Sequence, residues 1–165
     1  MITGILATFL LAGLSGCGGG SKASVAPIER LTPSRDPAVV RYRAVIDVDM
    51  RAITFALDKE ACSTRTECTN ELIHIKAATD AMLVDLGPGA APPAIGVPTE
   101  RLKVAAQDFR DQLDAALVVV QQPNSNYFAA GAAPTVHDLY LAAGYLDCWP
   151  DQPVNAPGEG DYSCA

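Results

Sequence analysis

The amino-acid sequence predicts an all-α protein, an up-and-down four-helix bundle followed by an irregular tail. Four segments carry apolar residues at steps of three and four, which places those residues on one face of a helix. No segment shows the sustained apolar alternation that is typical of a half-buried strand. Connections of short or moderate length join the four segments, and helices joined in this way pack antiparallel. The pattern divides the chain into an apolar start (residues 1–16), a tether (17–35), a helical domain (36–147) and a tail (148–165).

The chain begins with an apolar segment, residues 2–14, that contains no charged residue. Its length of about 13 residues suits the apolar part of a signal peptide and falls short of the ~20 that span a bilayer as a helix. No Lys or Arg precedes the segment, although signal peptides usually start with positive charge. The residues that follow, Leu14-Ser15-Gly16-Cys17, resemble the lipobox of bacterial lipoproteins, in which the cysteine becomes the first mature residue.

This resemblance implies that residues 1–16 are removed and that the Cys17 thiol receives a diacylglyceryl group, with palmitate or a similar acyl chain often added to its amine. Two or three acyl chains hold a protein on a membrane almost permanently, at about 0.8 kcal/mol per buried CH₂. The implied location is the bacterial cell envelope. Gly18 rather than Asp follows Cys17, which resembles outer-membrane sorting in bacteria with two membranes. An ordinary signal peptide and a buried apolar helix with an incidental cysteine are the alternative interpretations.

The tether of residues 17–35 shows neither helical nor strand periodicity and is rich in Gly, Ser and Pro at its start and end. Asp36 followed by Pro37 is typical of a helix start, with Asp as the N-cap and Pro at the first helical position. We expect this first helix to reach about Glu60. Its apolar face consists of Val39, Tyr42, Ile46, Met50, Ile53 and Leu57.

A second helix is predicted to end before Gly87-Pro88-Gly89. The polar stretch of residues 62–68 lies between the two helical patterns and therefore predicts the turn of an antiparallel hairpin. The apolar face of the second helix consists of Cys68, Leu72, Ile75, Thr79, Met82 and Leu86.

A proline-rich connection, residues 87–98, leads into a third helix that starts at Pro98 or Thr99 and ends at Gln122-Pro123. Residues 124–134 predict a loop whose two aromatic residues plug one end of the bundle. Thr135 followed by Asp138 is typical of a capping box and predicts the start of a short fourth helix. The apolar faces of these two helices consist of Leu102, Ala106, Phe109, Leu113, Leu117 and Val120, and of Val136, Leu139, Ala143 and Leu146.

Four cysteines follow Cys17, and an even number in an exported chain predicts two disulfides. Metal binding by these cysteines is the competing interpretation, but their spacing contains no CxxC pair. The bundle places the first two at one end and the third toward the other end, which favours the pairs Cys62–Cys68 and Cys148–Cys164. Closing loops of about 7 and 17 residues contributes roughly 2.4 and 3.1 kcal/mol on the loop-entropy model. Disulfides between the first two and the last two of these cysteines stay possible, because the tail could run back along a short fourth helix.

The net charge of −7 is concentrated in the last third of the chain. Up to Arg110 the basic and acidic residues are equal in number, whereas residues 111–165 contain seven acidic residues and no basic residue. This third of the chain would repel nucleic acid and anionic lipid. Five of its acidic residues either keep an exposed segment soluble or contact a basic partner, and these are Asp138, Asp147, Asp151, Glu159 and Asp161.

Three polar residues are the candidates for a ligand or metal site inside the bundle. Glu71 and His74 have the Glu-x-x-His spacing of di-iron bundles, but helical geometry turns His74 about 120° from the apolar stripe, toward solvent. Asp49 lies near the first apolar face and is expected to bond Thr79 or Tyr42, or to mark a small polar site. Because no catalytic motif accompanies them, the sequence predicts no catalytic residue, metal or cofactor.

These observations predict a membrane-anchored envelope lipoprotein that is not an enzyme. We expect it to act as an interaction or structural module with another envelope protein as its partner. The alternative is a helical bundle that binds a small ligand or a metal, with Asp49, Glu71 and His74 as the contributors.

Overall fold

The computed structural model describes residues 32–58 and 62–150, and the chain is helical there. Within these two ranges there is no strand, so the expectation of an all-α protein is confirmed. A 3₁₀ turn, η1 (Pro93–Ile95), precedes the third of the α-helices. The α-helices are α1 (Pro37–Leu57), α2 (Arg65–Asp85), α3 (Gly96–Gln121), α4 (Tyr127–Gly131) and α5 (His137–Cys148).

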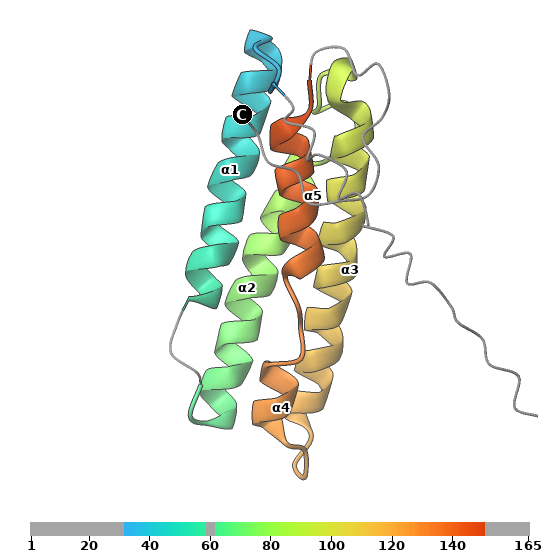
Figure 1. Cartoon of the computed structure of the whole chain (residues 1–165). Coiled ribbons are helices and arrows are strands. Elements are labelled where there is room, and N and C mark those ends of the chain that lie inside the picture. The colour runs from blue at the N-terminus through green and yellow to red at the C-terminus, as the bar shows by residue number, and fades with distance from the viewer. Residues whose placement is uncertain (1–31, 59–61, 151–165) are drawn as a thin grey trace, which may run out of the picture.

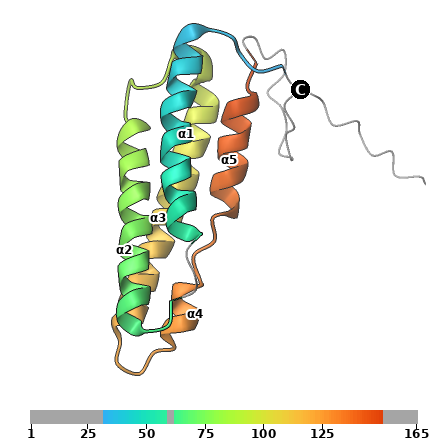
Figure 2. The ribbon, with the colours of Figure 1, turned by 90° about the vertical axis from the view of Figure 1, so that its left-hand side faces the viewer.

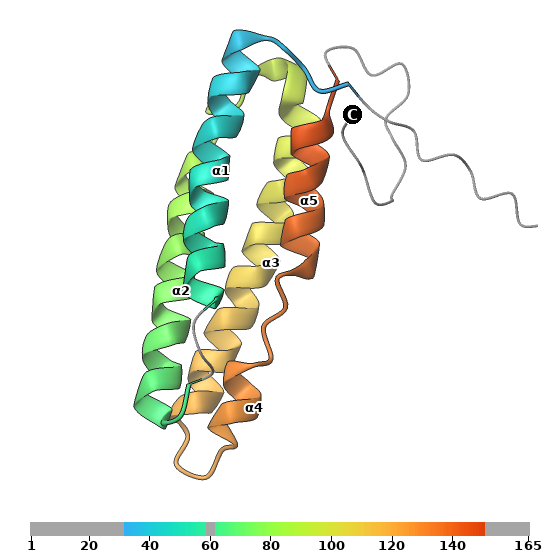
Figure 3. The ribbon, with the colours of Figure 1, turned by 60° about the vertical axis from the view of Figure 1, so that its left-hand side comes forward.

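The three longest helices lie along the molecule, and α2 runs antiparallel to both α1 and α3 (Figure 1). The shorter helices α4 and α5 follow one another along α3 and together form a fourth column (Figures 2 and 3). As a result, α1 starts and α5 ends at the same end of the molecule, which we call the terminal end. The start of α2 lies with α4 at the opposite end, which we call the turn end (Figure 1).

The predicted apolar faces form the core. On the first three helices every predicted face residue is buried except Leu57 and Leu117, which are partly buried and pack against the core. On α5, Leu139 and Leu146 are buried. The buried hydroxyl of Thr79 donates to the carbonyl of Ile75 at 2.9 Å. Hydrophobic burial therefore holds the helices together, and the periodicity of the sequence locates that core correctly.

The end of α1 and the starts of α2 and α3 differ from the sequence prediction. Helix α1 begins after Asp36, whose carboxylate accepts the N–H of Ala38 as expected of an N-cap, but it ends at Leu57 and not near Glu60. Helix α3 begins at Gly96, because η1 leads directly into it.

Helix α2 begins three residues before its first core residue, at Arg65. The cause is a capping box that the sequence analysis missed. The hydroxyl of Thr64 accepts the N–H of Glu67 at 3.2 Å, and the Glu67 carboxylate accepts the N–H of Thr64 at 3.1 Å. These hydrogen bonds lower the pKa of Glu67, with the side-chain and backbone groups of Ser63 contributing most.

The predicted capping box at Thr135 and Asp138 was wrong. Helix α5 begins at His137, and no side chain caps it. The backbone N–H of Thr135 instead donates to the side chain of Gln112 on α3, at 2.9 Å. Residues 124–134 are not entirely a loop either, since Asn126 caps the short helix α4 through a hydrogen bond from the N–H of Ala129.

A disulfide closes the turn end, between Cys62 and Cys68, as the sequence predicts. Their Cα atoms lie 5.0 Å apart, and Cys68 is buried in the first turn of α2. Helix α4 packs on this disulfide. Its residue Gly131 lies so close that a Cβ atom added there would be 3.6 Å from the sulfur of Cys62. Cys148 is buried at the end of α5, while its predicted partner Cys164 and the predicted lipid site Cys17 lie outside the described residues.

An arginine and a tryptophan close the terminal end. The guanidinium of Arg43 on α1 donates to the carbonyls of Leu146, Trp149 and Ser34, at 3.0, 2.7 and 3.3 Å. These contacts satisfy the carbonyls at the end of α5 with a positive charge, which also complements the helix dipole. The indole N–H of Trp149 donates to the carbonyl of Ala94. Ser34, at the end of the predicted tether, is therefore held against the bundle.

Candidate functional site

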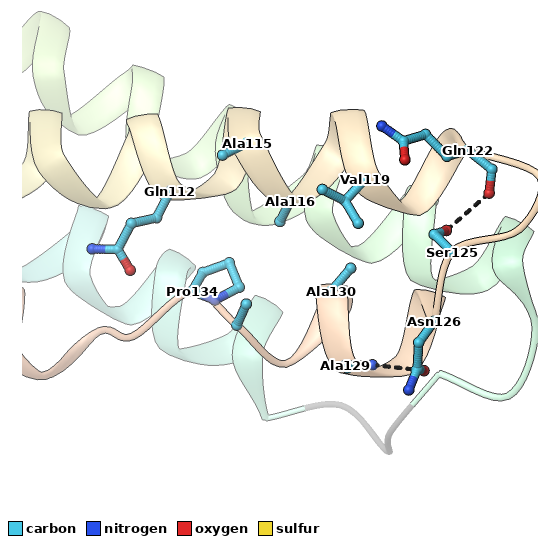
Figure 4. A pocket seen from close by; sticks show the side chains of 11 residues that line it. Gln112, Ala115, Ala116, Val119, Gln122, Ser125, Asn126, Ala129, Ala130 and Pro134 are labelled. Carbon is cyan, nitrogen blue, oxygen red and sulfur yellow. Dashed lines mark hydrogen bonds between the residues drawn. The ribbon is translucent and has the colours of Figure 1, made fainter.

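A hollow lies between α3 and α4, at the turn end. It encloses about 620 Å³, and Figure 4 shows that side chains of α3 face those of α4 and of the segment after it. Its walls are mainly methyl groups of alanine and valine, with amide and hydroxyl groups near the rim. The residues that line it on α3 are Gln112, Ala115, Ala116 and Val119.

A second hollow of about 370 Å³ follows along the same edge of α3, toward the terminal end. The α3 residues that line it are Arg101, Val104, Ala105 and Asp108, three or four positions apart like those of the first hollow. Helix α5 provides the other wall, through Asp138, Leu141 and Ala142. We call the two hollows together the α3 groove.

Arg65 at the start of α2 fixes the wall of the groove at the turn end. Its guanidinium donates to the carbonyl of Val120, to that of Gln122 at 2.6 Å and to that of Pro123 at 3.1 Å. It also donates to the hydroxyl of Ser125 at 3.0 Å and lies over the ring of Tyr127, 5.1 Å from the ring centre. One side chain therefore caps the end of α3 and holds the loop that leads into α4.

The charge along the groove is mainly negative. Asp108 and Asp138 are exposed and line the second hollow from opposite walls. Within the described ranges neither forms an ion pair. Arg101 lines the same hollow, but its guanidinium lies 4.7 Å from the ring centre of Tyr145 on α5. The groove thus offers apolar walls with two carboxylates near its middle.

The structure does not bring the three predicted site residues together. Asp49 contacts Asp85, the last residue of α2, whereas Glu71 lies fourteen positions earlier on that helix, about 21 Å along its axis. His74 is exposed, as the sequence predicts, and His137 is exposed at the start of α5. Among residues 32–58 and 62–150, no three His, Cys, Asp or Glu side chains are grouped so as to hold a metal ion.

Asp49 and Asp85 form a pair of carboxyl groups between α1 and α2. Burial raises the pKa of Asp49 to about 6, and the charge and hydrogen bond of Asp85 act in the same direction. One Asp49 oxygen is buried and has no hydrogen-bond partner when both groups are ionised. A proton on Asp49 provides the missing donor toward Asp85. Burial also raises the pKa of the neighbouring Tyr42 hydroxyl, while its hydrogen bond with Thr99 acts in the opposite direction.

This pair predicts a pH dependence of stability between about pH 4 and about pH 6. Because folding raises the pKa of Asp49, the folded state holds this proton more tightly, so stability falls as pH rises from about 4 to about 6. Asp49→Asn should raise the free energy of unfolding at pH 7 by about 1 kcal/mol, after allowance for partial exposure. The substitution should also reduce the increase in the free energy of unfolding that occurs on acidification from pH 7 to pH 5. Urea unfolding at both pH values will measure this increase.

Asp80→Asn is the matched control for this prediction. Lys76 and Arg110 hold the pKa of Asp80 below its ordinary value, so its contribution to stability is constant from pH 7 to pH 5 and is lost only at lower pH. If both variants changed the difference in the free energy of unfolding between pH 5 and pH 7 equally, the assignment of this pH dependence to Asp49 would be contradicted.

No helix in the described part of the chain combines the length and the apolar character needed to cross a membrane. Comparisons of the chain with protein-family models, with curated protein sequences and with solved structures found no match.

The groove was not predicted from the sequence, although one signal was present. Beside the core stripe of α3, Ala115 and Val119 lie four positions apart and give the helix a second apolar edge. In a fully covered helix this edge would be buried, yet Ala115 is exposed and Val119 is 40% exposed. The short helix α4 covers only part of the edge, and that helix was not predicted.

Proposed function

We propose that the protein is a lipid-anchored lipoprotein of the bacterial envelope that acts as a non-catalytic interaction module. Acylation at Cys17 would fix it to a membrane, with the outer membrane favoured in bacteria that have two. Its contact surface would be the α3 groove, and its partner another envelope protein.

The observation that carries this proposal is the position of the groove relative to the start of the folded chain. Ser34 is held at the terminal end by a hydrogen bond from its N–H to the carbonyl of Trp149, at 3.1 Å. The larger hollow lies at the turn end, near the last residues of α3. Helix α3 has 26 residues and is therefore about 39 Å long. A tether that enters at the terminal end would leave the hollow pointing away from the membrane.

We further infer that α1, α2, α3 and α5 constitute the predicted up-and-down four-helix bundle, with α4 extending its fourth column. Such a bundle presents a rigid surface, because its core is apolar and both ends are fastened by arginine side chains. Arg43 holds the terminal end and Arg65 holds the turn end. A rigid module of this kind binds a partner with little loss of conformational freedom.

A second candidate function is the binding of a small apolar ligand. The volume of the first hollow, about 620 Å³, falls within the range of small-molecule sites, and its walls are mostly apolar with a few amide groups. This candidate replaces the predicted site of Asp49, Glu71 and His74, because those residues lie apart.

Labelled palmitate tests the anchor. Cells that produce the wild-type protein should incorporate the label, and Cys17→Ser should abolish incorporation and leave residues 1–16 attached. Cys148→Ser is the matched control, since another cysteine is removed while the lipobox stays intact. An unlabelled wild-type protein, or equal label in Cys17→Ser, would overturn the proposed anchor.

A further inference from the structure

The α3 groove has the features of a site for an amphipathic helix. We propose that it binds an apolar helical segment carrying basic side chains, supplied by the partner protein. This inference rests on the proposed role as an interaction module, and names the partner's chemistry and its place of contact.

The length and shape of the groove suit a helix. Its two hollows extend from Arg101 to Gln122, which corresponds to about 30 Å along the axis of α3. Helix α3 has 26 residues, whereas α4 and α5 have 5 and 12, so the fourth column leaves part of this edge uncovered. Alanine side chains line the uncovered part, and small residues allow another helix to approach closely.

The apolar side chains along the groove are placed to meet such a segment. Val104 is 49% exposed, Val119 is 40% exposed and Leu141 of α5 is 37% exposed. A partner helix with apolar residues at steps of three and four would cover all three, as in other helix-in-groove complexes. Burying them would contribute roughly 25 cal/mol per Å² of apolar surface removed from water.

The charges select a basic segment. Asp108 and Asp138 face the groove, and residues 111–165 contain no Lys or Arg. The nearby basic residues of α3 have partners, since Arg101 lies over Tyr145, Lys103 pairs with Glu100 and Arg110 pairs with Asp80. A Lys or Arg on the partner would therefore meet two carboxylates that form no ion pair within the described structure and that outnumber the one guanidinium of this hollow, that of Arg101, whereas an acidic segment would be repelled.

Two synthetic peptides test the inference on the full chain. Both are fluorescein-labelled 18-residue helices with leucines at steps of three and four, one with lysines on its flanks and the other with glutamates. Fluorescence anisotropy at low salt should show binding of the lysine peptide at least tenfold tighter than of the glutamate peptide. Asp108→Asn combined with Asp138→Asn should weaken that binding about threefold to tenfold and reduce its salt dependence.

Apolar-face variants locate the binding site. Val119→Asp should weaken binding of the lysine peptide at least tenfold, whereas Val84→Asp should leave it unchanged, because Val84 is 76% exposed on α2 away from the groove. Circular dichroism will verify that both variants stay folded. Equal loss in both variants, equal binding of the two peptides, or binding of neither peptide would overturn the inference.

A neutral apolar dye, N-phenyl-1-naphthylamine, tests the alternative that the groove binds small apolar molecules. Dye binding that Val119→Asp abolishes, without binding of either peptide, would assign the groove to small apolar molecules and would also overturn the inference. The peptide experiment does not require acylation, so its failure is independent of the palmitate test of the anchor.

Discussion

Phe109→Ala is expected to lower the free energy of unfolding by about 3 to 5 kcal/mol. Phe109 is 1% exposed and lies on α3, the helix that packs against α2, α4 and α5. Removing its ring leaves a cavity that the surrounding helices fill only in part. Because domains of this size are stable by about 5 to 15 kcal/mol, the variant should unfold at a much lower urea concentration, as circular dichroism at 222 nm will measure.

Val118→Ala is the matched control on the same helix, because Val118 is 62% exposed. It should change the free energy of unfolding by no more than about 0.5 kcal/mol. Similar unfolding midpoints for the two variants would mean that α3 does not pack through the face that contains Phe109.

The second large effect is expected from Arg65→Ala, at about 2 to 3 kcal/mol. The substitution leaves the carbonyls of Gln122 and Pro123 without their charged donor and removes the contact with the ring of Tyr127. The loss of stability should be local as well as global, because the loop before α4 would no longer be held against α2. Hydrogen exchange should therefore speed up in residues 122–131 more than in α1.

Two further arginine variants test whether Arg65 stabilises the protein through the hydrogen bonds of its guanidinium or through its charge alone. Arg65→Lys keeps the charge but loses the planar guanidinium, so it should recover only part of the stability. Arg51→Ala removes an exposed arginine that pairs with Asp47 on the surface of α1, and it should have almost no effect. Equal destabilisation by Arg51→Ala and Arg65→Ala would contradict the role assigned to Arg65.

The core was predictable because it depends on a pattern that repeats over many residues. Steps of three and four along α1, α2 and α3 identify the buried face from residue type alone. Cys62–Cys68 was predictable for a related reason, since a polar stretch between two amphipathic patterns indicates a chain reversal that can bring the two cysteines together.

The parts that were not predictable depend on single contacts between distant residues. Helix α4 has only 5 residues, too few to show a period, and it is held by Arg65 and by the disulfide beneath Gly131. A capping box was predicted at Thr135, where none forms, and was not predicted at Thr64, where one is present. Thr64 and Glu67 form the real box, whereas the backbone of Thr135 is bonded by Gln112.

Two properties of the candidate residues were predicted from the sequence, the exposure of His74 and the position of Asp49 near the core. Asp49 was predicted to be an acidic residue near the core, and it is partly buried between α1 and α2. Its partner Asp85 was not foreseen, because the two residues meet only through the packing of two helices. The α3 groove likewise results from the difference in length between α3 and the helices beside it, which no local pattern encodes.

Photo-crosslinking in intact cells tests the central claim, that the α3 groove is the contact surface of an anchored module. A benzophenone amino acid replaces Val119 in the groove or, as the control, Val84 on α2. After illumination of intact envelopes, the account predicts a discrete crosslinked protein from position 119 and none from position 84. The yield of the adduct should fall when Asp108→Asn and Asp138→Asn are introduced together. Crosslinks from position 84 with none from position 119 would contradict the account and place the contact surface on α2.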